Sequence, residues 1–121
     1  WSKNKVKNAI NAVKKFNTAV SADNKIKSKV KRNSKTRYWS ANLKSGYVDI
    51  GKSLSYSAAK SYVKSGRSVF TVTDAEAKAL AKNASGGKKP VYHTKHKNSV
   101  GYYKHYHLYN HSNGAHIWFL Y

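Results

Sequence analysis

The chain contains no cysteine and no methionine, and only four of its 121 residues are acidic. Without cysteine there are no disulfides and no thiolate metal ligands. Cysteine usage therefore does not indicate whether the protein works in an oxidising or a reducing compartment. No apolar run approaches the length of a membrane-spanning helix, and we expect no signal peptide within these residues. We therefore expect one domain, residues 1–121, without stable membrane insertion. Because the chain opens at Trp1, we expect it to be a piece of a longer polypeptide.

The scarcity of acids excludes two kinds of hydrolase. Paired-carboxylate glycoside hydrolysis and two-metal nuclease chemistry both need clustered acids. Here the acids are dispersed, at Asp23, Asp49, Asp74 and Glu76. Two of them have a structural explanation, because Thr73 followed three residues later by Glu76 is the capping box of a helix.

Basic residues dominate what is present. Twenty-four lysines and arginines give a formal net charge of +20. A field of this size requires a polyanion as partner: nucleic acid, an anionic membrane face or an acidic protein. A hydrophobic content of 40% argues against disorder.

The periodicity of the chain predicts an α+β fold, in which N-terminal helices precede a twisted, mainly antiparallel sheet with one or two inserted helices. Residues 1–35 form a basic helical segment, with a helix at 3–20 and a linker or frayed helix end at 27–35. Residues 36–121 form the catalytic core. Its strands are expected at 36–43, 46–50, 68–72, 90–96, 102–109 and 115–121, and its helices at 57–65 and 74–84.

The first helix has an apolar stripe at helical spacing, and we expect the stripe to pack on the sheet. A lysine-rich helix of this kind would also suit an anionic bilayer, but the stripe lacks leucine and has a single large aromatic residue. The stripe consists of Val6, Ile10, Val13, Phe16 and Val20.

All six histidines lie between His93 and His116. Asn113-Gly114 is a strong signal for a type I′ hairpin turn, which would set Tyr109 opposite Trp118. Strand alternation then gives the hairpin two faces. One face carries His105, His107, Tyr109, His111, His116 and Trp118. The other face carries Tyr106, Leu108, Ile117, Phe119 and Tyr121, and should meet the helices.

A histidine face on so basic a chain suits metal-free cleavage of RNA. Two imidazoles serve as general base and general acid, and cations bind the phosphate. Aromatic side chains can stack a base that is turned out of the strand. The substrate-binding candidates are Lys95, Lys104, Tyr109, Trp118, His93 and His111.

Two alternatives remain open. His105 and His107, with His111 or His116 opposite, have the spacing of a three-histidine zinc site. The chain could also be a nucleic-acid-binding module without catalytic activity, although pure binding leaves the histidine face unused. We expect no cofactor and no metal.

The C-terminal third also resembles a known family, the C-terminal toxin domains of bacterial polymorphic toxins of the Rhs, wall-associated or LXG types. The similarity covers about residues 47–121. It is carried by Lys89-Pro90-Val91-Tyr92-His93, Tyr103-Lys104-His105-Tyr106-His107 and Asn113-Gly114-Ala115-His116-Ile117-Trp118-Phe119.

The resemblance implies a ribonuclease, often of barnase-, EndoU-, colicin- or RelE-like fold, with His105, His107 and His116 in the active site. It implies a domain that is secreted or borne on the cell surface within a larger protein and that acts in the cytoplasm of a neighbouring cell. The implied partners are an RNA substrate, such as tRNA, and a cognate acidic immunity protein. The domain is otherwise expected to be monomeric.

Overall fold

The core of the fold is one six-stranded sheet with strand order β2-β1-β3-β6-β5-β4. The computed structural model describes residues 3–94 and 101–121. Only β3 and β6 pair in parallel, and the other neighbours are antiparallel. The α+β class expected from the sequence is confirmed. The strands are β1 Tyr38–Lys44, β2 Tyr47–Leu54, β3 Ser68–Thr71, β4 Val91–His93, β5 His105–His107 and β6 Ile117–Phe119.

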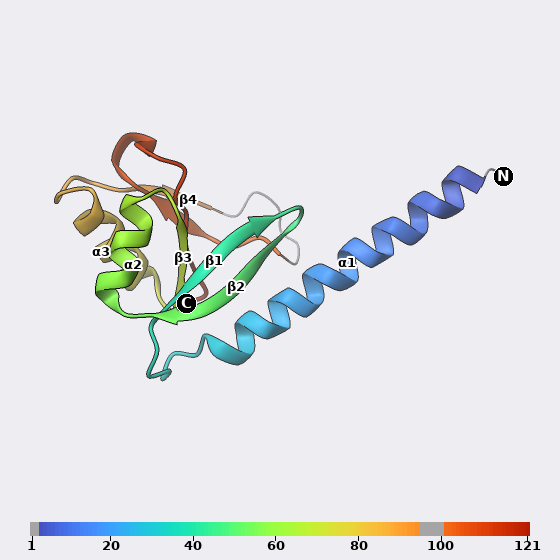
Figure 1. Ribbon diagram of the computed structural model, residues 1–121, viewed down its shortest axis with the longest axis horizontal. Helices are drawn as coiled ribbons and strands as arrows, with labels where there is room; N and C mark the ends of the chain where they lie inside the picture. The colour runs from blue at the N-terminus through green and yellow to red at the C-terminus, as the bar shows by residue number, and fades with distance from the viewer. Residues whose placement is uncertain (1–2, 95–100) are drawn as a thin grey trace.

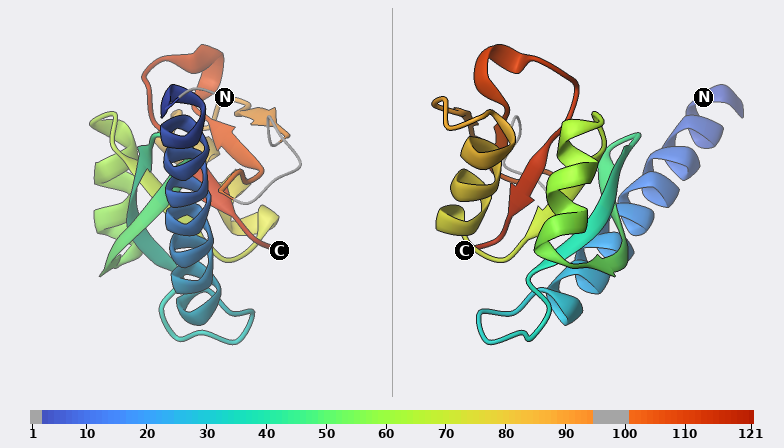
Figure 2. Two further views of the ribbon diagram at one scale, coloured as in Figure 1. Left: turned by 90° about the vertical axis from the view of Figure 1, so that its right-hand side faces the viewer. Right: turned by 60° about the vertical axis from the view of Figure 1, so that its left-hand side comes forward.

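Helices cover both faces of this sheet (Figures 1 and 2). Helices α2 (Tyr56–Lys64) and α3 (Asp74–Ala84) pack on one face, over a core that includes Val69, Leu80 and Ile117. The C-terminal half of α1 (Lys3–Lys29) packs on the other face, over a second core with Phe70 and Trp118 among its members. The expectation that Ile117 and Phe119 meet helices is confirmed.

Local signals fix the two inserted helices where the sequence placed them. The Ser55 hydroxyl accepts a hydrogen bond from the amide of Ala58 at the start of α2. The Thr73 hydroxyl does the same for the amide of Glu76 at the start of α3, as expected of a capping box. Gly66, just beyond α2, has a φ of +89°, a left-handed conformation in which glycine carries little steric penalty.

The prediction for the first helix is wrong in two respects. Helix α1 runs on past residue 20 to Lys29, into the segment expected to be a linker or a frayed helix end. Its buried apolar residues are Ala19, Ala22 and Ile26, not the strong stripe before them. The N-terminal half of α1 extends beyond the sheet (Figure 1). Ile10, Val13 and Phe16 are exposed, whereas Val6 and Val20 are half-buried.

The predicted hairpin turn is also wrong. The left-handed residues are Asn110 and His111, within the 3₁₀ helix η1 (Tyr109–His111), and Trp118 pairs with His105. Asn113 uses its side chain to hold the loop instead: its amide donates to the carbonyl of Val63, and its oxygen accepts from the amide of Ala115. Trp118 therefore pairs four residues earlier than expected, and this even shift leaves the two faces of the strands unchanged.

Candidate active site

Five histidines from four separate places in the chain meet on one face of the sheet. His93 lies on β4 directly opposite His105 on β5, and His107 follows two residues later on the same face. His111 comes from η1, and His116 immediately precedes β6. We call these five residues the histidine cluster. The sixth histidine, His96, lies outside the described residues.

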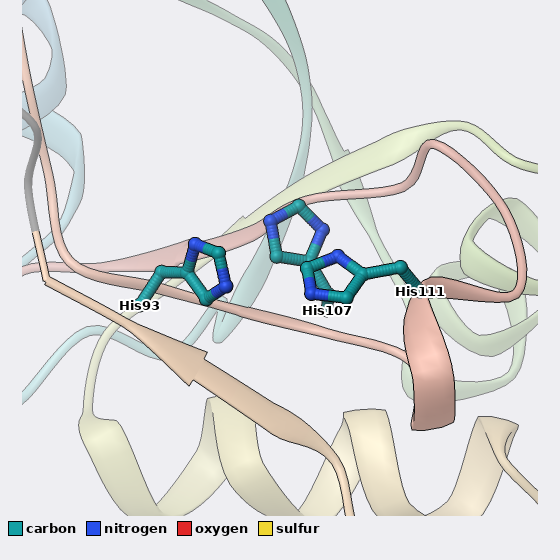
Figure 3. A group of neighbouring side chains, drawn as sticks. All are labelled: His93, His107 and His111. Carbon is teal, nitrogen blue, oxygen red and sulfur yellow. The ribbon is translucent and has the colours of Figure 1, made fainter.

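His107 is the centre of the cluster. Its ring centroid lies 4.9 Å from that of His93, 4.9 Å from that of His105, 4.5 Å from that of His111 and 4.6 Å from that of His116. Figure 3 shows the rings of His93, His107 and His111 converging from three elements. The structure thus brings together all three histidines expected to be catalytic, and adds two expected only to bind substrate.

Two members of the histidine cluster are buried, although they lie on the face opposite the one that was expected to meet the helices. His105 is 3% exposed and His107 is 8% exposed, because the surrounding rings cover them. His93 and His116 are half-buried, and His111 is exposed. His116 also stacks on Trp118, with ring centroids 5.0 Å apart and planes within 5° of parallel. The cluster therefore has a buried floor, His105 and His107, and a rim that reaches the surface.

Backbone carbonyls fix the tautomers of the two floor histidines. His107 Nδ1 lies 3.1 Å from the carbonyl oxygen of Ala115, and His105 Nδ1 lies 3.1 Å from that of Tyr103. A carbonyl oxygen only accepts hydrogen bonds, so each Nδ1 must carry a proton. In the neutral rings the lone pair is therefore on Nε2.

Burial holds the central histidine neutral. Burial is the largest cause, and together with the neighbouring imidazoles His116, His105, His111 and His93 it lowers the pKa of His107 to about 4. A charged His107 would lose hydration and be repelled by any protonated neighbour.

This shift makes the stability of the fold dependent on pH. In the unfolded chain His107 titrates near 6.5, so between about pH 6.5 and 4 the unfolded state binds more protons. We expect the contribution of His107 to the free energy of unfolding to be fully present above pH 6.5. It should be lost as the pH drops to 4, which lowers the free energy of unfolding by roughly 2–3 kcal/mol. Thermal melts of the wild type and His107→Gln in EDTA test this. Parallel pH profiles for the two proteins would contradict it.

The other residues expected to bind substrate differ in their exposure and in their distance from the histidine cluster. Lys104 is exposed and directly precedes His105 in the sequence. Trp118 is 3% exposed within the second core, so its ring is not available to stack a base. Tyr109 lies outside the cluster: it lines a separate surface pocket with Tyr92 and Tyr106, and Lys88 lies 5.1 Å from its ring centroid. The 3₁₀ turn rotates it out of the strand alternation. Lys95 is outside the described residues.

All four carboxylates are engaged in structural pairs. Glu76 binds Arg37 at 2.6 Å, and this contact holds the pKa of Glu76 below its usual range. Asp49 faces Lys25 at 3.9 Å. Tyr106 donates to Asp74 at 2.5 Å, and Tyr103 donates to Asp23 at 2.6 Å. The exclusion of carboxylate-based chemistry is consistent with these positions.

The last two pairs position the histidine strand, a role that the sequence analysis missed. The Tyr103–Asp23 bond ties the start of β5 to α1 on one face of the sheet. The Tyr106–Asp74 bond ties β5 to α3 on the other face. Burial and these bonds raise the pKa of both phenols, so the hydroxyls remain donors. Partners 80 and 32 residues apart leave no signal in local spacing.

The cluster has two overlapping sets of three nitrogen ligands. One consists of His93, His107 and His111, and the other of His105, His107 and His116; within each set the ligand atoms lie within 4.8 Å of one another. In the described part of the chain, both sets are made of histidine alone. The arrangement can therefore offer paired imidazoles for proton transfer, or three neutral nitrogens for a transition metal.

Comparison with protein-family models, with curated proteins and with solved structures finds no match to this chain.

Proposed function

We propose that this domain is a metal-independent ribonuclease, the toxin part of a larger antibacterial protein. The observation that carries the proposal is the histidine cluster: five imidazoles in mutual ring contact, three of which reach the surface of a chain with a net charge of +20. So many titratable rings together are unfavourable for a basic protein, which favours a functional explanation over a structural one.

The chemistry needs two imidazoles at one phosphate. The base removes the proton of the 2′-hydroxyl, and the 2′-oxygen attacks the adjacent phosphorus to form a 2′,3′-cyclic phosphate. The acid protonates the 5′-oxygen as its bond to phosphorus breaks. We assign these roles to the rim, with His111 and His116 as the pair, because their rings flank His107 at 4.5 and 4.6 Å.

The buried members then take a supporting role. His105 and His107 were expected to be catalytic, but at 3% and 8% exposure they offer little surface to a polynucleotide. Their fixed tautomers form the floor on which the rim is oriented. His93 completes the rim on the β4 side and, with Lys104, contributes to phosphate binding.

The basic surface accounts for the proposed partners. RNA is bound chiefly through phosphate contacts to lysine and arginine. A free ribonuclease of this kind would injure the cell that makes it, so an acidic immunity protein covers the rim of the cluster, guided by charge. In this proposal the domain is carried outside its cell within a larger polypeptide and acts in the cytoplasm of a target cell.

Chelation gives the first test of the proposal. We expect purified domain to degrade cellular RNA equally well with and without EDTA, because acid–base catalysis by imidazole needs no metal ion. A zinc-dependent nuclease in a parallel reaction shows that chelation is complete. Loss of activity in EDTA with recovery on added zinc would contradict metal independence.

That outcome would favour a second candidate, a nuclease with a three-histidine zinc site. Zn–N bonds of about 2.0–2.1 Å put ligand nitrogens roughly 3.3 Å apart, so a set spanning at most 4.8 Å needs only small shifts. The carbonyls that bind Nδ1 of His105 and His107 leave Nε2 as the ligand atom, an arrangement common in zinc sites. Visible absorption of the Co²⁺-loaded protein would reveal such a site without an activity assay.

A further inference from the structure

The N-terminal half of α1 has an apolar stripe that no described part of the domain covers. Ile10 is 49% exposed, Val13 57% and Phe16 60%, and the helix extends away from the sheet at this end (Figure 1). Such a run of large apolar side chains on an exposed helix marks an interaction surface. No helix among the described residues is long and apolar enough to cross a bilayer.

The stripe is not an overhanging continuation of the packed face. At 100° per residue, Ile10, Val13 and Phe16 are centred roughly 140° around the helix from Ala19, Ala22 and Ile26, which pack on the sheet. Two separate apolar faces therefore exist on one helix. The face with Ala19, Ala22 and Ile26 packs on the sheet, and the face with Ile10, Val13 and Phe16 is exposed.

Lysines border the stripe on both sides. Lys7 and Lys14 project beside Ile10 on one edge, and Lys5 lies on the opposite edge, about three turns N-terminal to Phe16. Residues 3–18 contain no acid, and the only carboxylate of α1 is Asp23, which lies in the packed half. An apolar strip bordered by lysines on a helix of low mean hydropathy is typical of helices that lie in the interface of an anionic membrane.

We propose that the N-terminal half of α1 binds reversibly to the surface of an anionic phospholipid bilayer. Ile10, Val13 and Phe16 enter the boundary between headgroups and acyl chains, and the flanking lysines contact lipid phosphates. A second copy of the chain is a poor occupant, since the lysines at the stripe edges would repel one another. RNA would engage the lysines and leave the apolar stripe in water.

This surface is separate from the histidine cluster, so the inference does not depend on the proposed function. The test is co-sedimentation with vesicles of phosphatidylglycerol and phosphatidylcholine, or of phosphatidylcholine alone. We expect binding to the anionic vesicles only. We expect the Ile10→Gln, Phe16→Gln double variant to lose at least tenfold in affinity, with an unchanged melting temperature because both side chains are exposed.

Leu43→Gln is the matched control, because Leu43 is an equally exposed apolar residue, 58%, at the end of β1. It should bind vesicles like the wild type. Equal binding of the double variant and the wild type would show that net charge alone attracts the protein, and would overturn the proposal. So would an absence of binding to anionic vesicles, which would leave an acidic protein as the occupant. Ribonuclease activity on RNA in solution should be the same for all three proteins.

Discussion

Replacing His111 by asparagine, or His116 by glutamine, should slow RNA cleavage by two to four orders of magnitude at neutral pH. Each change removes an imidazole that transfers a proton in the transition state. Two to four orders of magnitude is the usual contribution of a general acid or base to the rate. Asparagine is chosen at position 111 because the φ of 49° there is left-handed, a conformation that asparagine tolerates. RNA affinity should change little, because lysine–phosphate contacts dominate binding. Single-turnover rates and filter binding measure the two quantities separately.

Variants in the core beneath α2 and α3 are the controls for this expectation. Ile117→Ala and Phe119→Ala remove buried side chains on the opposite face and should cost roughly 1.5–5 kcal/mol of stability, with activity lost only as the protein unfolds. His107→Ala should also destabilise, since it empties the centre of the cluster. If the rim variants melt early and keep full activity below their melting temperatures, the rim is structural and the catalytic assignment is wrong.

Deoxyribose at the scissile nucleotide should abolish cleavage. The proposed reaction uses the 2′-oxygen as its nucleophile, and a deoxynucleotide has none. An otherwise identical oligonucleotide with one deoxy position is the substrate, and gel analysis at high enzyme concentration sets the detection limit. Neighbouring ribonucleotides should still be cut, which shows in the same lane that the enzyme is active.

The salt dependence of binding separates this result from simple failure to bind. The deoxy-substituted strand should bind as tightly as RNA at low salt, and both affinities should fall steeply as salt rises. Efficient cutting of an all-deoxy strand would remove the 2′-hydroxyl from the mechanism. Equal binding of both strands with no cutting of either would favour a nucleic-acid-binding module.

The features predicted well from the sequence depend on contacts between residues close in the chain, or on the alternation of side chains along a strand. The caps of α2 and α3 are set by Ser55 and Thr73, whose side chains bond amides three residues away. The gathering of His105, His107 and His116 on one face follows from the period of two along a strand, and so survives the error in the turn. The dispersion of the four acids along the sequence agrees with their separate structural pairs.

The failures depend on distant contacts. Helical periodicity shows that a helix has an apolar face, but not whether anything covers it; Phe16 fits the pattern better than Ala22, yet Ala22 is the buried residue. The burial of His105 and His107 was missed because histidine is half-exposed on most strands, and here other histidines cover them. Asn113 was expected to form a turn because Gly114 follows it. Its actual bond to Val63, 50 residues earlier, leaves no signal in the local sequence.

The parallel pairing of β3 with β6 has a consequence for the order in which the protein folds. Strand β6 lies between β3 and β5, so it joins a sheet of β2, β1 and β3 to a pair formed by β5 and β4. Until residues 117–119 dock, these are two pieces with open edges. Pairing between strands so far apart in the sequence makes for slow folding. The histidine cluster contains His116, the residue just before β6, and is therefore complete only once β6 has docked. A nascent or partly folded chain would thus carry the charge of the mature domain without its proposed catalytic rim.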